Sequence, residues 1–266
     1  MHFVDPDSIP TTGNAAIDAH HRHIAHAVNH VYEAWKGWDG IGSLDTSLAA
    51  ALRDVEIHLT VEEIITRGAG YQEWKFHETL HDALRSRLRD VAEHAGAVPH
   101  RHLSLMQAFE FFDQMIFQHE FFDDQDFWDT FRRHAEAPRG PRLVTWDSRL
   151  VLGENGVDSR HSELVAALNA VHEAIADRAA CDDVLARFDI LRDDWLAHLE
   201  TEVTRIGRPE SQPAKQAREA IDILRADLAL ARRHCEDGDC EATGAFLVNQ
   251  ARFWLLDHIT YQHRLF

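Results

Sequence analysis

The sequence predicts an all-α protein made of two tandem, antiparallel four-helix bundles. Apolar residues recur along most of the chain with the 3.6-residue period of amphipathic helices. Alternating runs of β-branched residues, which would indicate strands, are almost absent from the sequence. The chain also repeats internally, because His21 recurs as His161 and His58 recurs as His198, each 140 residues later.

Four helices are expected in each half of the chain. In the first half they cover residues 15–38, 46–67, 71–95 and 100–124. Glycines that follow Lys36 and Arg67 mark the ends of the first two helices, and Gly96 with Pro99 separates the third from the fourth. In the second half the helices cover residues 158–179, 183–206, 212–236 and 241–264, with breaks at Gly207–Pro209 and Gly238. Short loops make successive helices antiparallel, so each set of four predicts a bundle.

The two bundles are expected to form separate domains, over residues 1–137 and 141–266. Each half has an ordinary domain size of roughly 100–150 residues. The expected linker is Ala137-Pro138-Arg139-Gly140-Pro141, whose two prolines and glycine cannot continue a helix.

Composition limits the partners and the compartment. A formal net charge of −18 argues against nucleic acid and anionic membranes as partners. No apolar run is long enough to span a bilayer, and the first residues do not resemble a signal peptide. Three cysteines, an odd number, favour a reducing compartment, so we expect the cytoplasm. The CEDGDC segment with Cys235 and Cys240 is interpreted as a loop.

The first half contains a set of residues suited to two metal ions. His58 and Glu62 lie four residues apart and share one helix face, as do His77 and His81 on the next helix. His21 lies on the first helix, and His119 and Asp124 lie on the fourth. Imidazoles suit iron, zinc, copper and nickel, and a carboxylate can bridge two metals. Burying this set without a metal would cost several kcal/mol.

The choice of Asp124 over Asp123 depends on the repeat. Asp123, four residues after His119, would share its helix face better than Asp124. In the second half, however, the fourth residue after His258 is Gln262 and the fifth is His263. A ligand-type residue at the fifth position in both halves favours Asp124.

Together these motifs resemble the hemerythrin family. The family pattern I-D-x-x-H, H-x-x-x-E, H-x-x-x-H and H-x4-D matches the first half at Ile17-Asp18 with His21, at His58 and Glu62, at His77 and His81, and at His119 and Asp124. The resemblance covers essentially the whole first half. It implies an oxo- or hydroxo-bridged di-iron centre that binds O2 at one open iron. By this resemblance, His77, His81 and His119 would hold the filled iron, His21 and His58 the open one, and Glu62 and Asp124 would bridge them.

Glu120 departs from the family pattern, which usually has isoleucine directly after the fourth-helix histidine; the second half keeps Ile259 there. Either Glu120 is a solvated carboxylate at the pocket rim, or it reaches the open iron or a bound oxygen species. In the second case it would disfavour simple O2 carriage and favour peroxide chemistry or a gated site.

The second half keeps only part of the set. Glu62 recurs as Glu202 and His119 as His258, but no histidine answers His77 or His81, which align near residues 216–217 and 220–221. Two alternatives remain open. The first is one further metal ion held by His161, His198, Glu202 and His263, with or without His258. The second is a relic bundle with core histidines.

The leading expectation is a protein that binds O2 for storage, delivery or sensing. The alternative is a di-iron enzyme that acts on O2, peroxide or nitric oxide, with Glu120 modifying the site. A simple interaction module is disfavoured by the complete ligand set of the first half.

Overall fold

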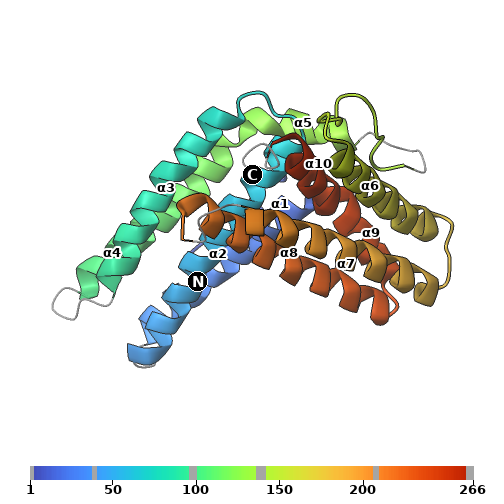
Figure 1. Cartoon of the computed structure of the whole chain (residues 1–266). Helices are drawn as coiled ribbons and strands as arrows, with labels where there is room; N and C mark the ends of the chain where they lie inside the picture. Colours follow the sequence, from blue (N-terminus) through green and yellow to red (C-terminus); the bar gives the residue numbers. More distant parts are fainter. Residues whose placement is uncertain (1–2, 38–40, 96–100, 136–141, 206–209, 262–266) are drawn as a thin grey trace. The chain divides into compact units, whose positions relative to one another are not determined.

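The structure is a computed structural model that describes residues 3–37, 41–95, 101–135, 142–205 and 210–261. Among these residues every regular element is a helix and no strand occurs, so the all-α prediction is confirmed for this part of the chain (Figure 1). The chain folds into two compact units. The first comprises Met1–Thr66 and Gly70–Ala135, and the second comprises Glu136–Phe266 together with Arg67–Ala69.

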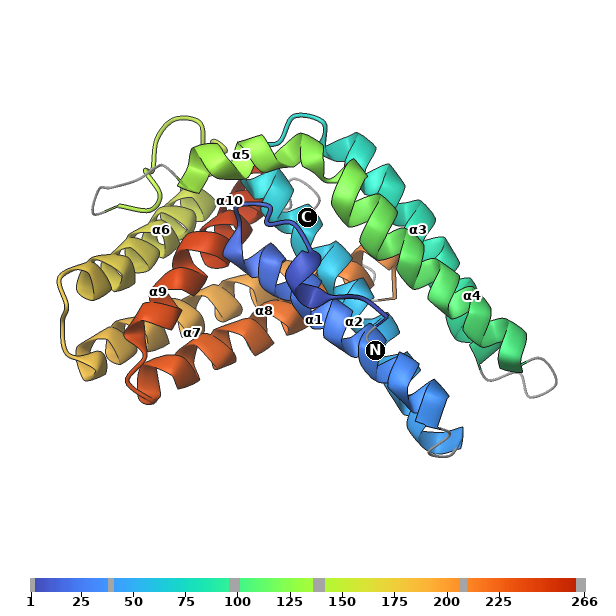
Figure 2. The ribbon, with the colours of Figure 1, turned by 180° about the vertical axis from the view of Figure 1, so that it is seen from behind.

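The first unit contains a short 3-10 turn and five α-helices. They are η1 (Pro6–Ser8), α1 (Ala15–Gly37), α2 (Ile41–Gly68), α3 (Trp74–Ala95), α4 (Arg101–Asp113) and α5 (Gln125–Ala135). A π-helical segment, η3 (Gln114–Asp123), joins α4 to α5. One apolar core takes side chains from α1, α2, α3, α4 and η3, among them Val28, Val55, Leu84, Phe111 and Met115. In both views α3 and α4 lie side by side (Figure 1, Figure 2).

The second unit repeats this helical order. It contains α6 (Asn155–Ala176), α7 (Cys181–Arg205), α8 (Gln212–Glu236), α9 (Cys240–Phe246), the π-helical segment η4 (Leu247–Ala251) and α10 (Arg252–Thr260). Consecutive helices pack on each other, α6 on α7 and α7 on α8 (Figure 2). Its largest fully buried side chains are Trp195, Phe188 and Phe253.

The helix boundaries follow the sequence closely except in the fourth helix. The α2 helix begins at Ile41, five residues before the predicted start, and α8 has the predicted bounds. The predicted continuous helix 100–124 is wrong, because it changes to π-helix at Gln114, and α5 was not predicted. In the second unit the predicted fourth helix is likewise divided, in this case by η4. A π-turn changes only the hydrogen-bond spacing, from four residues to five, so helical periodicity does not reveal it.

The predicted turns at Gly70 and Gly238 are present. Their φ angles of +78° and +87° lie in the left-handed region that glycine adopts without steric penalty. The predicted linker 137–141, the breaks near Gly40, at Gly96–Pro99 and at Gly207–Pro209, and the last residues of the final helix lie outside the described residues. Within the described part, every helix is too short or too polar to cross a lipid bilayer.

An asparagine clamp fixes the segment that precedes the first helix of each unit. Asn29 Oδ1 accepts hydrogen bonds from the backbone N–H groups of Phe3 (2.8 Å) and Val4 (3.0 Å), and its Nδ2 donates to the Val4 carbonyl (2.7 Å). In the second unit Asn169 repeats the pattern with Leu143 (2.8 Å) and Val144 (3.1 and 2.8 Å). The internal repeat therefore extends to the contacts that attach the leading segment.

We expect Asn29→Ala and Asn169→Ala each to destabilise its own unit. Each substitution leaves buried backbone groups without partners, at about 1–3 kcal/mol for each group. The free energy of unfolding, measured by urea titration, should fall by at least this amount in both variants. Asn249→Ala is the control, because Asn249 donates to Ala245 within its own helical turn. Equal stability of all three variants would show that the clamp contributes nothing.

Candidate metal centre

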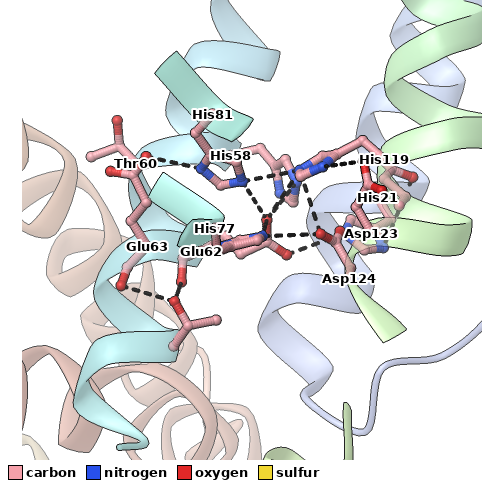
Figure 3. A network of polar contacts seen from close by, with 12 residues as sticks. His21, His58, Thr60, Glu62, Glu63, His77, His81, His119, Asp123 and Asp124 are labelled. Atoms are coloured by element: carbon pink, nitrogen blue, oxygen red, sulfur yellow. Dashed lines mark hydrogen bonds and ion pairs between the residues drawn. The ribbon is translucent and has the colours of Figure 1, made fainter. Parts of the chain in front are cut away.

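The helices of the first unit direct eight side chains that could ligate a metal toward one place in its core. Seven of the eight, all except Glu120, are labelled in Figure 3. None of the eight is more than 3% exposed. Helix α1 supplies one, α2 and α3 supply two each, and η3 with the residue after it supplies three. They are His21, His58, Glu62, His77, His81, His119, Glu120 and Asp124.

One group of donors surrounds Glu62 with three histidines. The Nε2 atoms of His81 and His119 lie 3.0 Å apart, and His81 Nε2 lies 3.2 Å from Glu62 Oε2. His77 Nε2 lies 3.8 Å from the same oxygen and 3.0 Å from Asp124 Oδ1. Such separations suit several ligands of one ion, since a metal about 2.0–2.2 Å from each donor places neighbouring donors roughly 3 Å apart.

A second group of donors also lies next to Glu62. The donor atoms of His21, His58 and Glu120 lie within 4.8 Å of one another. His21 Nε2 is 4.0 Å from Glu62 Oε1, and His21 Nδ1 is 3.9 Å from Glu120 Oε2. His58 Nε2 lies 3.7 Å from Glu62 Oε2, the oxygen that also faces His77 and His81, so the Glu62 carboxylate lies within 4.0 Å of imidazoles from both groups.

The π-helical segment explains how Asp124 reaches the site. In an α-helix a residue five positions on would point roughly 140° away. Here the Asp124 N–H donates to the His119 carbonyl (3.2 Å), an i→i+5 bond whose wider turn returns Asp124 toward the face of His119. Asp124 Oδ1 consequently lies 3.5 Å from His119 Nε2, whereas Asp123 Oδ2 lies 3.8 Å from Nδ1 on the outer side of the ring.

Burial and mutual charge control the protonation of the site. Burial lowers the pKa of both His21 and His58, which keeps these imidazoles neutral and their lone pairs available. Burial alone would raise the pKa of Glu62, but the surrounding histidines, His58 first, lower it well below its ordinary value. Burial, followed by the charge of Asp124, raises the pKa of Glu120 well above its ordinary value.

The chemistry of the donors fits a cation. Among the described residues, no hydrogen-bond partner is found for either ring nitrogen of His21 and His58 or for either carboxylate oxygen of Glu120. Leaving buried polar atoms unpaired costs about 1–3 kcal/mol each. A metal ion would satisfy them together and would also compensate the clustered carboxylates. These buried clusters could therefore hold a metal ion.

A histidine partner that the sequence did not indicate is Glu63. Its Oε1 lies 2.9 Å from His81 Nδ1. Burial would raise the pKa of Glu63, but His81 and Arg85 lower it to about 2, so the group is a carboxylate and His81 Nδ1 is the donor. The lone pair of His81 is then on Nε2, which faces the cluster. A clue existed in the sequence, since Arg85 lies one helical turn after His81.

The second unit brings together four of the five predicted residues. The donor atoms of His161, His198, Glu202 and His258 lie within 4.8 Å of one another, and His263 lies outside the described residues. Where His77 and His81 align with α8, Ala217, Ala220 and Ile221 instead line a small cavity of about 10 Å³ with His258.

The three cysteines meet at one end of the second unit. Cys235 and Cys240 flank the predicted turn at Gly238, with their sulfur atoms 3.4 Å apart, and Cys240 Sγ lies 2.6 Å from Cys181 Sγ. The sequence did not predict this contact, because the spacing of Cys181 from the other two cysteines does not indicate that they lie together.

Comparisons of the chain with protein-family models, with curated proteins and with solved structures found no match.

We expect Glu63→Ala to weaken metal binding at the first site about 10–100-fold, because it removes the acceptor that orients His81. Competition with a chromophoric chelator measures this change. Glu56→Ala is the matched control, since Glu56 also accepts a hydrogen bond from Arg85 and belongs to none of the candidate metal clusters. Equal weakening in both variants would point to Arg85, not Glu63, as the important group.

Proposed function

We propose that the first unit is a hemerythrin-like four-helix bundle that holds two iron ions and binds O2 for storage, delivery or sensing. The observation that carries the proposal is the contact of one buried carboxylate, Glu62, with buried imidazoles of both groups. Its Oε2 lies 3.2 Å from His81 Nε2 and its Oε1 lies 4.0 Å from His21 Nε2. A carboxylate with a nitrogen donor on each side suits a bridged pair of metals.

The same proposal extends to the architecture. We infer that α1, α2, α3 and α4 with η3 are the four antiparallel helices of one bundle, and that α6 to α10 form a second. The repeated asparagine clamp supports a common plan for both units. Only the first unit has a histidine pair on its third helix.

Each donor has a role in this proposal. His77, His81 and His119 would hold one iron, His21 and His58 would hold the other, and Glu62 and Asp124 would supply carboxylate ligands to the pair. Glu63 keeps His81 Nε2 free for the metal through its bond to Nδ1. Phe127 of α5 packs edge-on against the His77 ring, 5.1 Å between centroids, and so fixes its orientation. The iron pair would supply electrons and a coordination position that a diatomic ligand can take.

We expect the double substitution His77→Ala/His81→Ala to remove at least one iron from each chain and to bleach the near-ultraviolet absorption of an oxo-bridged pair. Two imidazole ligands of one ion are lost, and no described neighbour replaces them. Elemental analysis and absorption spectra measure both effects. His94→Ala on α3 is the control, because His94 is exposed and bonds to the Asp90 carbonyl of its own helix. Unchanged iron content in a folded double variant would overturn the assignment.

A second candidate function follows from Glu120, which is 1% exposed. The interpretation of Glu120 as a solvated carboxylate at the pocket rim is therefore wrong. Because it lies with His21 and His58, it is placed to act as a third ligand of their ion or to hold a proton beside it. Either role interferes with reversible O2 binding. This observation favours a di-iron enzyme that acts on O2, peroxide or nitric oxide.

Glu120→Ile separates the two candidates. If Glu120 assists the chemistry, the variant should reduce peroxide about 10²-fold more slowly, because an isoleucine side chain cannot donate a proton. For the same reason the variant should stay oxygenated longer in air. Stopped-flow turnover and autoxidation half-lives measure this. Glu110→Ile is the control, since Glu110 is exposed on α4. Identical rates in the wild type and both variants would leave O2 binding as the better proposal.

A further inference from the structure

The second unit contains a compact donor cluster of its own. Three imidazoles and one carboxylate come from three different helices, α6, α7 and α10. His161, Glu202 and His258 are buried, and His198 is partly exposed. His258 belongs to this cluster, although the sequence alone left its participation open.

The three imidazoles converge through their Nε2 atoms. His198 Nε2 lies 3.1 Å from His161 Nε2 and 3.0 Å from His258 Nε2. Every pair of these rings is nearly perpendicular, at 87°. The three rings are mutually perpendicular, and their Nε2 atoms point toward one common position. An ion about 2.0–2.1 Å from each nitrogen would produce separations of roughly 3.0–3.4 Å.

The carboxylate of Glu202 is the fourth donor group of the cluster. Its Oε1 lies 3.4 Å from His198 Nε2, and its Oε2 lies 3.2 Å from His258 Nε2. Both oxygens thus face the nitrogens and not the solvent, since Glu202 is 2% exposed. Three imidazoles and a carboxylate are a donor set for divalent first-row transition metals.

Hydrogen bonding among the histidines does not account for this geometry. A ring nitrogen carries either one N–H or one lone pair. His198 Nε2 therefore cannot form two full hydrogen bonds, yet it lies within 3.1 Å of the nitrogens of both neighbours. A single cation at this position would receive all three lone pairs at once.

Within the described part of the second unit, the donors suffice for one ion. In the first unit, α3 supplies His77 and His81, whereas the aligned part of α8 has Gln216, which is exposed, and the side chains of Ala217, Ala220 and Ile221, which line the cavity beside His258. These alanine and isoleucine side chains have no lone pair to donate. A second metal next to the first would have no nitrogen ligands from this helix.

We propose that the second unit binds one divalent transition-metal ion, independently of the first unit, through His161, His198, Glu202 and His258. A cavity borders this site on the side of the partly exposed His198. This cavity of about 680 Å³ is lined by His198 and Glu202, together with Arg160, Asp194 and Thr201. The ion can therefore exchange with solution and accept a small ligand from that side. The first centre, whose donors are all at most 3% exposed, exchanges its metal more slowly.

The test uses the full chain, stripped of metal and reloaded with Zn²⁺, so that it does not depend on iron or on O2. We expect His198→Ala to bind one Zn²⁺ fewer per chain than the wild type after desalting. His172→Ala is the matched control, because His172 is a partly buried histidine on α6 outside the cluster. It should bind as many ions as the wild type. Circular dichroism confirms that each variant keeps its helices.

Chelator kinetics give a second readout. EDTA should remove one Zn²⁺ from the wild type at least tenfold faster than the remaining ions, and this fast phase should be absent from His198→Ala. Glu202→Gln, which keeps the side-chain shape, should accelerate the fast phase if His198→Ala does not fold. A folded His198→Ala chain with the full metal count and an unchanged fast phase would overturn the proposal.

These outcomes are independent of those for the first unit. His77→Ala/His81→Ala should reduce the slowly released metal and leave the fast phase intact. Loss of the fast phase in that variant would show that the two sites are not independent, and would overturn this part of the inference. Failure of the O2 proposal would leave the Zn²⁺ count unaffected.

Discussion

The organisation of the first unit depends on the burial of Glu62, Glu120 and Asp124 in a core of apolar side chains. Removing a charge from water costs several kcal/mol unless a partner compensates it. Five imidazoles from four helical segments surround these carboxylates. Packing of these helices therefore also assembles the donor residues of the site. The helices must meet at this level of the core for the buried charges to be tolerated.

Much of this arrangement could be predicted because it follows from helical geometry. Pairs such as His58 and Glu62 share a face at a spacing of four, and the internal repeat singled out Asp124. The π-helical segment could not be predicted, since it changes hydrogen-bond spacing without changing composition. The contacts of Glu63 with His81, and of Cys181 with Cys240, join different helices, and no local pattern records which helix faces meet.

Comparison of the two units distinguishes the features that maintain the fold from the residues that could bind metal. Both keep the asparagine clamp and a histidine on the first helix, followed by a histidine and a glutamate on the second. They differ on the third helix, where one has two imidazoles and the other has alanine and isoleucine side chains. Neither the clamp nor the helix order depends on this difference, so the number of donors can change while the fold persists.

The π-helical segment before Asp124 also affects how sequences of this kind are aligned. A wide turn takes up a surplus residue locally, so the chain can gain or lose one position there without rotating the packed faces on either side. The first unit has ten residues in π conformation and the second has five, yet the repeat offset is 139 both where the fourth helix begins, at Arg101 and Cys240, and at His119 and His258. The one-residue difference between the units therefore lies before the fourth helix, and an alignment that places its gap there pairs the fourth-helix histidines in spite of the unequal π-helical segments.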